Sequence, residues 1–278
     1  MKVVVTGASG YIGRHVVDVL VNMGHDVVAV DMINKGINTD AKFKSMDIFS
    51  DDIFEKLGRP DACIHMAWKD GFSHSSDAHM GMLSKHYYFV KSMIDSGVKY
   101  LSVMGSMHEI GYYEGEVDDD TPTNPLSMYG IAKNALREAS LLLSKNSNTN
   151  FKWLRAYYIL GDDANNNSIF TKITQMEHEG KKTFPFVSGK NKYDFIEVDE
   201  LAKQIAVAST QEKYNGIINC CTGKPMSLAD KVNEFIETHH YAIRPDYGKF
   251  PERPYDSPAI WGNSKKIETI MKEYDENK

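Results

Sequence analysis

Short apolar runs alternate with segments of helical periodicity through the first half of the chain. The short runs predict strands, at residues 2–6, 26–30, 43–46, 61–66, 100–104 and 151–156. The periodic segments predict helices, at residues 11–23, 51–57, 78–96 and 127–145. Such alternation is typical of an α/β fold, in which helices cover both faces of a doubly wound parallel sheet.

After Gly161 the regular alternation ends. A polar loop at 162–167 is followed by a helix and a short strand before residue 192, and then by a helix at 198–209, a strand at 217–220 and a helix at 228–240. We therefore expect residues 161–278 to form a smaller lobe whose segments are interleaved with the main sheet. Ligands of open α/β sheets bind outside the carboxyl ends of the strands, which predicts a substrate cleft between the two parts.

A glycine-rich segment, Gly7-Ala8-Ser9-Gly10-Tyr11-Ile12-Gly13, follows the first predicted strand directly, and the second strand ends at Asp31. This order is that of a dinucleotide-binding βαβ unit, although a glycine turn also occurs structurally in other α/β proteins. Glycines let the backbone approach a pyrophosphate at the helix N-terminus. Residues 1–160 are thus predicted to form a Rossmann-type NAD(P)-binding domain. The Asp31 carboxylate suits ribose hydroxyls and repels a 2′-phosphate, which favours NAD over NADP.

Tyr129 and Lys133 are four residues apart on the helix predicted at 127–145, so they share one face. A phenol titrates near ~10, and a neighbouring cation favours the phenolate and lowers that pKa. This pair suits proton transfer to and from a sugar or alcohol oxygen while a hydride moves on the carbon. The same spacing also occurs on solvated helix faces, so its significance depends on the glycine segment.

The glycine spacing G-x-x-G-x-x-G and several later segments resemble the extended short-chain dehydrogenase/reductase family, the nucleotide-sugar epimerases, dehydratases and reductases. These later segments reach from the third strand to residue 199: Asp47-Ile48, His65-Met66-Ala67-Trp68, Met104-Gly105-Ser106, Thr121 to Pro125, Leu154-Arg155 to Gly161, Asp194-Phe195-Ile196 and Val198-Asp199. With the C-terminal segment described below, the resemblance covers nearly the whole chain.

The resemblance implies a catalytic group of Ser106, Tyr129 and Lys133. Ser106 is expected directly after the fifth strand, where it would hydrogen-bond the reacting oxygen; the alternative is a turn serine. Tyr129 would transfer the proton, and Lys133 would tune Tyr129 and hold the nicotinamide ribose. The implied cofactor contacts are Gly7, Gly10, Tyr11, Ile12, Gly13, Asp31, Asp47, Ile48, Met66, Ala67, Trp68, Tyr129 and Lys133.

Substrate contacts are expected from residues in several segments: Ser106, His108, Tyr158, Asn167, Arg253 and Asp256. The segment Pro251 to Ser257 resembles the diphosphate-binding arginine segment of the family, and a guanidinium fork suits a diphosphate. The alternative is a surface loop in which Arg253 pairs with Glu252. The base stays open, since thymidine, guanosine, uridine and cytidine diphosphate sugars all fit.

Departures from the family pattern reduce the number of reactions that the chain is expected to catalyse. Dehydratases carry an acid pair directly after the catalytic serine or threonine, where this chain has Met107 and His108, and Glu109 is one position too late. Tyr158 replaces an asparagine frequent in 4-epimerases, and the bulk of Trp68 would restrict rotation of a keto sugar. We therefore expect reduction of a nucleotide-linked 4-keto-6-deoxy-hexose, with Tyr129 as general acid, in surface-polysaccharide synthesis. The alternatives are a 4-epimerase with tightly bound NAD and a non-catalytic NAD(P)-binding sensor or scaffold.

Composition excludes other classes of function. The net charge is −6 without a basic run, which argues against nucleic acid as a partner, and no stretch approaches the ~20 apolar residues of a membrane span. The N-terminus enters a strand at once, and three cysteines make no disulfide framework, so a cytoplasmic location is expected. The histidines at 74, 79, 86 and 108 lack metal-site spacing. His79 and His86 are expected at a helix–helix contact or as partners of polar groups.

A homodimer is a further expectation from the resemblance, through the helices at 78–96 and 127–145. The second of these helices carries an apolar stripe that suits an interface and a core equally well: Leu136, Ala139, Leu142 and Leu143.

Overall fold

The computed structural model describes residues 1–161, 168–252 and 256–277. Within these residues, seven strands form one parallel sheet in the order β11-β7-β5-β4-β1-β2-β3. Their bounds are β1 Lys2–Thr6, β2 Asp26–Asp31, β3 Lys42–Ser45, β4 Ala62–His65, β5 Tyr100–Ser106, β7 Asn150–Ala156 and β11 Gly216–Cys220. The strand order reverses between β1 and β4, as in a doubly wound sheet. The predicted fold class is therefore confirmed.

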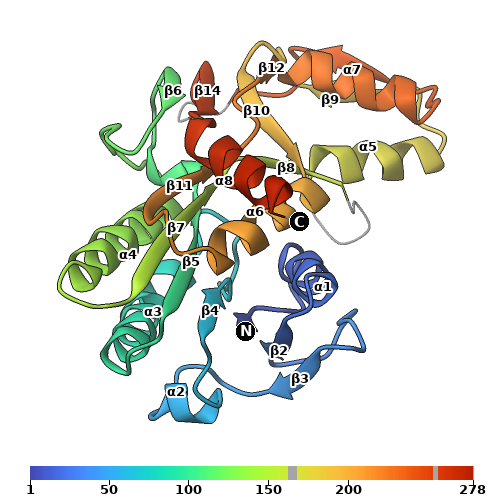
Figure 1. Ribbon diagram of the computed structural model, residues 1–278. Helices are drawn as coiled ribbons and strands as arrows, with labels where there is room; N and C mark the ends of the chain where they lie inside the picture. Colours follow the sequence, from blue (N-terminus) through green and yellow to red (C-terminus); the bar gives the residue numbers. More distant parts are fainter. Residues whose placement is uncertain (162–167, 253–255, 278) are drawn as a thin grey trace.

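Helices cover both faces of this sheet (Figure 1). One layer contains α2 (Ile53–Lys56), α3 (Ala78–Asp95) and α4 (Met128–Ser144), and the other contains α1 (Gly13–Asn22), α6 (Val198–Thr210) and α8 (Lys265–Glu276). Among the described helices, none is both long and apolar enough to cross a lipid bilayer.

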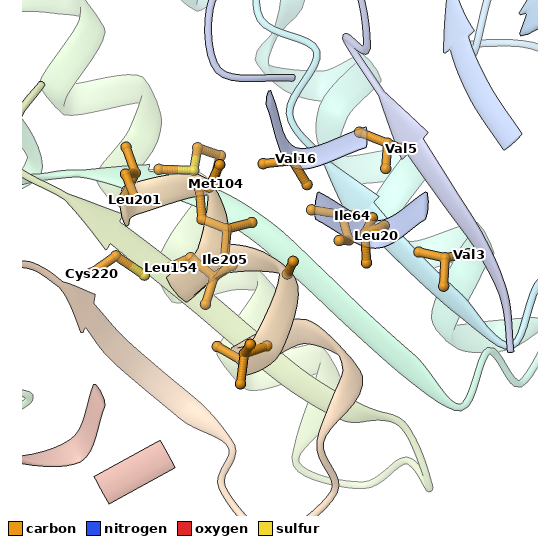
Figure 2. Close-up of a cluster of buried hydrophobic side chains, with 14 of the residues drawn as sticks. Val3, Val5, Val16, Leu20, Ile64, Met104, Leu154, Leu201, Ile205 and Cys220 are labelled. Carbon is orange, nitrogen blue, oxygen red and sulfur yellow. The ribbon is translucent and has the colours of Figure 1, made fainter. Parts of the chain in front are cut away.

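The main strands are apolar on both sides because each side faces a helical layer. In β1, Val3 and Val5 belong to the hydrophobic cluster under α1 and α6, whereas Val4 belongs to the cluster under α3 and α4. Figure 2 shows the first cluster, in which Leu201 and Ile205 of α6 lie over the sheet. The short apolar run that predicted the strand at 2–6 is thus explained by burial on both sides.

The second half of the chain builds a smaller layered region and then returns to the main sheet. One small sheet has the order β12-β10-β14-β6, with β8 paired to β10, and another joins β13 to β9. The bounds are β6 Gly115–Val117, β8 Tyr158–Leu160, α5 Ile169–His178, β9 Thr183–Phe186, β10 Lys192–Glu197, β12 Pro225–Ser227, α7 Leu228–Thr238, β13 Arg244–Tyr247 and β14 Ala259–Gly262. Strand β11 and helices α6 and α8 belong to the main sheet and its covering layer. A division of the chain at residue 160 remains a prediction.

Ser106 departs from its predicted place. It was expected after the fifth strand, but it is the last residue of β5 and pairs with Ala156 of β7. The strand continues to this point because the ladder with β7 is unbroken, and the 3₁₀ helix η1 (Met107–Glu109) begins directly after it.

We expect a Gly13→Ala substitution to destabilise the fold. A Cβ on Gly13 would lie 2.1 Å from the Gly7 carbonyl oxygen, so the turn between β1 and α1 would have to open. Overpacking of this kind costs about 1–3 kcal/mol of unfolding free energy, measurable by urea unfolding. The matched control is Gly81→Ala on α3, where a Cβ meets nothing within 4 Å and helix propensity should add up to about 1 kcal/mol. Equal effects of the two substitutions would contradict this packing argument.

Candidate active site

The predicted cofactor loop lies at the carboxyl end of β1 and packs against the turn after β4. Gly7 has a φ of 70°, and a Cβ there would lie 2.6 Å from the Ala67 backbone nitrogen. The Thr6 hydroxyl accepts hydrogen bonds from the backbone N–H groups of Met66 and Ala67. The structure therefore brings Gly7, Met66 and Ala67 together, and α1 starts at Gly13 behind the loop.

Asp31, at the end of β2, is held beside the same loop. Its carboxylate accepts hydrogen bonds from the backbone N–H of Ser9 at 2.9 Å and of Met32 at 2.7 Å. This position suits the ribose hydroxyls of an adenosine at the edge of the sheet. Asp47 and Ile48 follow β3 at the same edge of the sheet, Asp47 exposed and Ile48 buried.

Tyr11 has a role that the sequence did not indicate. Its hydroxyl donates a hydrogen bond to the Gly161 carbonyl at 2.6 Å. Since Gly161 directly follows β8, the bond ties the glycine-rich loop to the start of the second half of the chain.

Ser106, Tyr129 and Lys133 converge where β5 ends and α4 begins. Ser127 caps α4 by accepting from the Gly130 N–H at 3.1 Å, which places Tyr129 in the first turn. Lys133, one turn further, is buried and donates from Nζ to the Met104 carbonyl at 2.8 Å. The Ser106 side chain lies close enough to Tyr129 to act on the pKa of its phenol. The three predicted catalytic residues thus form one group.

The sequence predicted a lowered pKa for Tyr129, and the direction of this prediction is wrong. Burial raises the pKa of Tyr129 to about 12, and the neighbouring Ser106 side chain opposes that rise only in part. Burial also lowers the pKa of Lys133 to about 7. The lysine does not stabilise the phenolate here, because its Nζ is bonded to the Met104 carbonyl and lies 5.8 Å from the centre of the Tyr129 ring.

Trp68 fills the space beside both catalytic side chains. Lys133 Nζ lies 3.8 Å from the centre of its ring, a cation–π contact, and the ring meets Tyr129 edge-on. The indole N–H donates to His79 Nδ1 at 3.0 Å, and the ring stacks on His86 with centroids 4.4 Å apart. His79 thus accepts a hydrogen bond from Trp68 and His86 stacks on it. This agrees with one of the two roles expected for these histidines, that of partners for polar groups.

Two further imidazoles surround Tyr129. His74 stacks on the phenol ring with centroids 5.1 Å apart and an interplanar angle of 9°, and its carbonyl accepts from the Tyr129 N–H. His108 meets His74 edge-on at 4.2 Å. The sequence predicted His108 at the substrate but gave no role to His74, because histidines far apart in sequence carry no signal of a shared site.

A pocket adjoins the catalytic group and contains part of the predicted substrate set. It is lined by residues from η1, the segment before α4, and the small sheet with its flanking loop: Met107, His108, Gly111, Leu126, Ser127, Tyr193, Asp256, Ser257 and Ile260. His108 and Asp256 are thus brought together. Tyr158 is not a lining residue but stacks on Tyr193 with centroids 4.1 Å apart. Asn167 and Arg253 lie outside the described residues.

Glu109 is a buried residue of the site that was not among the predicted site residues. It closes a capping box with Ser106, in which the Ser106 hydroxyl accepts from the His108 N–H and the Glu109 carboxylate accepts from the Ser106 N–H. The S-x-x-E pattern of residues 106–109 is the sequence signature of this motif. The spacing of these two residues is therefore a signal that could have located Glu109 beside Ser106.

Comparison with known proteins decides the family. The sequence profile of the NAD dependent epimerase/dehydratase family matches residues 3–221. The chain belongs to this family, as the resemblance indicated. A dTDP-6-deoxy-L-talose 4-dehydrogenase (NAD(+)) of Aggregatibacter actinomycetemcomitans is 44% identical over 271 residues, 94% of this chain and 99% of the relative. A UDP-glucose 4-epimerase of Lactobacillus helveticus is 27% identical, covering 98% of this chain and 91% of the relative.

Solved structures agree with the fold. A UDP-glucose 4-epimerase from Thermotoga maritima, crystallised with UDP-glucose, superimposes with a TM-score of 0.82 at 23% identity, over 97% of this chain and 92% of its own. MoeE5 in complex with UDP-glucuronic acid and NAD gives a TM-score of 0.82 at 20% identity, over 98% of this chain and 93% of its own. At these identities the likeness supports the fold alone.

We expect stability to fall in acid because of buried histidines. Burial lowers the pKa of His86 to about 3 from 6.5, so the unfolded chain binds more protons between those values. The stability that neutral, buried His86 contributes is fully present above about pH 6.5. As the pH falls below that value, the free energy of unfolding decreases by roughly 1.4 kcal/mol per pH unit. Urea unfolding at about pH 7 and about pH 5 should show a smaller loss for His86→Gln than for the wild type. The exposed His240→Asn is the control, and an unchanged loss in His86→Gln would contradict this assignment.

Proposed function

We propose that the protein is an NAD-dependent enzyme that interconverts the 4-hydroxyl and 4-keto forms of a nucleotide-linked 6-deoxy-hexose. The 44% identity to a dTDP-6-deoxy-L-talose 4-dehydrogenase over nearly both full chains supports this proposal. Oxidation at C4 of that sugar and the predicted reduction of a 4-keto-6-deoxy sugar are one reaction in opposite directions. Among the structural features, the convergence of Ser106, Tyr129 and Lys133 carries the proposal.

The residues at the carboxyl edge of the sheet fit NAD. The close contact of Gly7 with Ala67 leaves backbone rather than side chains facing a pyrophosphate, and Asp31 is placed for the adenosine ribose. NAD, when bound, supplies the hydride acceptor or donor for C4 of the sugar. Lys133 would hold the nicotinamide ribose, in exchange for its bond to the Met104 carbonyl.

The proton on the sugar oxygen is transferred by Tyr129. With a pKa of about 12 its hydroxyl is protonated at neutral pH, so it is ready to act as a general acid in reduction. Ser106 holds the same sugar oxygen by a hydrogen bond. In oxidation Tyr129 must first lose its proton, so that direction should accelerate as the pH rises.

A 4-epimerase with retained NAD is the second candidate, favoured by its occurrence among relatives of 25–28% identity. It would require the keto sugar to turn over beside the nicotinamide. Trp68, stacked on His86 and hydrogen-bonded to His79, is a rigid bulky neighbour of Tyr129 that opposes such a rotation.

We further propose a cytoplasmic role in making sugars for surface polysaccharides, and a homodimer formed through α3 and α4. The two helices pack together, and Tyr88 and Leu142 on them are 65% and 68% exposed. Large exposed apolar side chains on adjacent helices suit a two-fold helical interface.

Tyr129→Phe tests the proposed reaction. With dTDP-6-deoxy-L-talose and NAD⁺, followed by NADH absorbance, we expect kcat to fall about 10²–10⁴-fold because the general acid–base group is lost. The Kd for NAD⁺, measured by calorimetry, should change little. Tyr247→Phe, which alters an exposed tyrosine on β13, is the control. An unaffected kcat in Tyr129→Phe, or no NADH from the wild type, would overturn the proposal.

Asp31→Asn tests the cofactor preference. Removing the carboxylate removes its repulsion of a 2′-phosphate, so the ratio of the Kd for NADP⁺ to that for NAD⁺ should fall about tenfold or more. Asp26→Asn, at the opposite end of β2, should leave the ratio unchanged. Tighter binding of NADP⁺ than of NAD⁺ by the wild type would refute the assignment of Asp31.

A further inference from the structure

Glu109 is a fully buried carboxylate directly below the catalytic serine. It is 0% exposed, and three groups from β5 and β7 donate to it. The backbone N–H of Ser106 lies 3.3 Å away, the Trp153 indole nitrogen 2.8 Å and Arg155 Nε 2.7 Å. The carboxylate thus joins the end of β5 to the neighbouring strand β7.

The sequence makes room for this arrangement at Gly105. A Cβ on Gly105 would lie 2.2 Å from the Trp153 indole nitrogen, so only a glycine before Ser106 lets the indole reach Glu109. Gly105 therefore leaves room for the hydrogen bond from Trp153 to Glu109, and Ser106, the next residue, donates its own backbone N–H to the same carboxylate.

Stability alone does not explain a buried ion pair here. Desolvating Glu109 and the fully buried Arg155 costs several kcal/mol, and apolar residues of similar volume often serve a core equally well. Arg137 of α4 approaches the same carboxylate at 3.7 Å, from one turn beyond Lys133. The Glu109 carboxylate therefore interacts with both elements that carry the catalytic group: with β5 through the Ser106 N–H and with α4 through Arg137.

We propose that Glu109 is a positioning residue for the reaction: its carboxylate fixes Ser106 at the end of β5 and places a buried negative charge beside the catalytic group. The kinetic part of this inference rests on the function proposed above. The charge part concerns Lys133 alone and is testable without any sugar.

The electrostatic effect of Glu109 is the same in sign on both catalytic side chains. Burial lowers the pKa of Lys133 to about 7, and the Glu109 charge opposes that fall. Burial raises the pKa of Tyr129, and the Glu109 charge adds to that rise. Other titratable or charged groups face these three residues and are common to wild type and variant: His65, His74, His79, His86, His108, Arg137 and Arg155.

The test is Glu109→Gln, whose amide oxygen can still accept from Trp153 and Arg155 while the charge is lost. The pKa of Lys133 is read from the pH titration of ¹³C-labelled lysine side chains by NMR, with the resonance assigned by Lys133→Arg. We expect this pKa to fall by about half a unit or more in Glu109→Gln. The kcat/KM profile for oxidation should move to lower pH by a similar amount.

Asp194→Asn is the matched control. Asp194 is also 0% exposed and accepts from Thr222, Gly223 and Gly262 backbone N–H groups, but it has no part in the pKa of Lys133 or Tyr129. We expect Asp194→Asn to lower the melting temperature and leave both titrations in place. A purely structural role of Glu109 would give the same pattern in Glu109→Gln, and that result would overturn the proposal.

A second variant covers the case in which Glu109→Gln does not fold. Trp153→Phe keeps the carboxylate charge and removes one donor, so the pKa of Lys133 should stay within about 0.3 units of the wild type while kcat falls. A shift larger than this would contradict the role of the charge. Absence of turnover in the wild type would refute the proposed sugar reaction but would leave the NMR result decisive for Glu109.

Discussion

All strands of the main sheet run parallel between two helical layers, so their carboxyl ends meet at a single edge. That constraint brings together the glycine-rich loop after β1, Asp31 at the end of β2, the turn after β4 and Ser106 at the end of β5. Helix α4 then adds Tyr129 and Lys133 to the same edge. The predicted cofactor loop and the proposed proton-transfer group thus lie close together because the sheet brings them to one edge, although they are far apart in sequence.

Burial then decides the chemistry of the group. Tyr129 is held as a neutral phenol with a pKa of about 12, and Lys133 titrates near 7 because its ammonium is desolvated. Three surrounding groups stabilise the ammonium and so offset part of the cost of its desolvation. The Met104 carbonyl and the Trp68 ring bind the ammonium directly, and Glu109 supplies a buried opposite charge. The site therefore combines deep burial, which excludes water, with a small set of fixed polar partners.

The sequence predicted the strands of the main sheet and most of its covering helices from their apolar runs and helical periods, but it missed α8. It also missed strands of the small sheets: β6, β8, β10 and β12 to β14, of which all but β10 have only three or four residues. Ser106, Tyr129 and Lys133 were predicted from a fixed helical spacing and from the family resemblance, and they lie together in the structure. The direction of the Tyr129 pKa shift was wrong, because burial of the phenol and the orientation of the Lys133 side chain depend on tertiary packing. Glu109 and Trp153, 44 positions apart, meet only after β5 and β7 pair.

The central claim is net hydride transfer at C4 of a nucleotide-linked 6-deoxy sugar rather than epimerisation. It is tested most directly with dTDP-6-deoxy-L-talose carrying deuterium at C4, incubated with NAD⁺ and analysed by mass spectrometry of both products. We expect the deuterium to leave the sugar and to accumulate in free reduced NAD in step with a keto sugar. Deuterium retained at C4 of a sugar with inverted configuration, without free reduced cofactor, would show a 4-epimerase and contradict the claim.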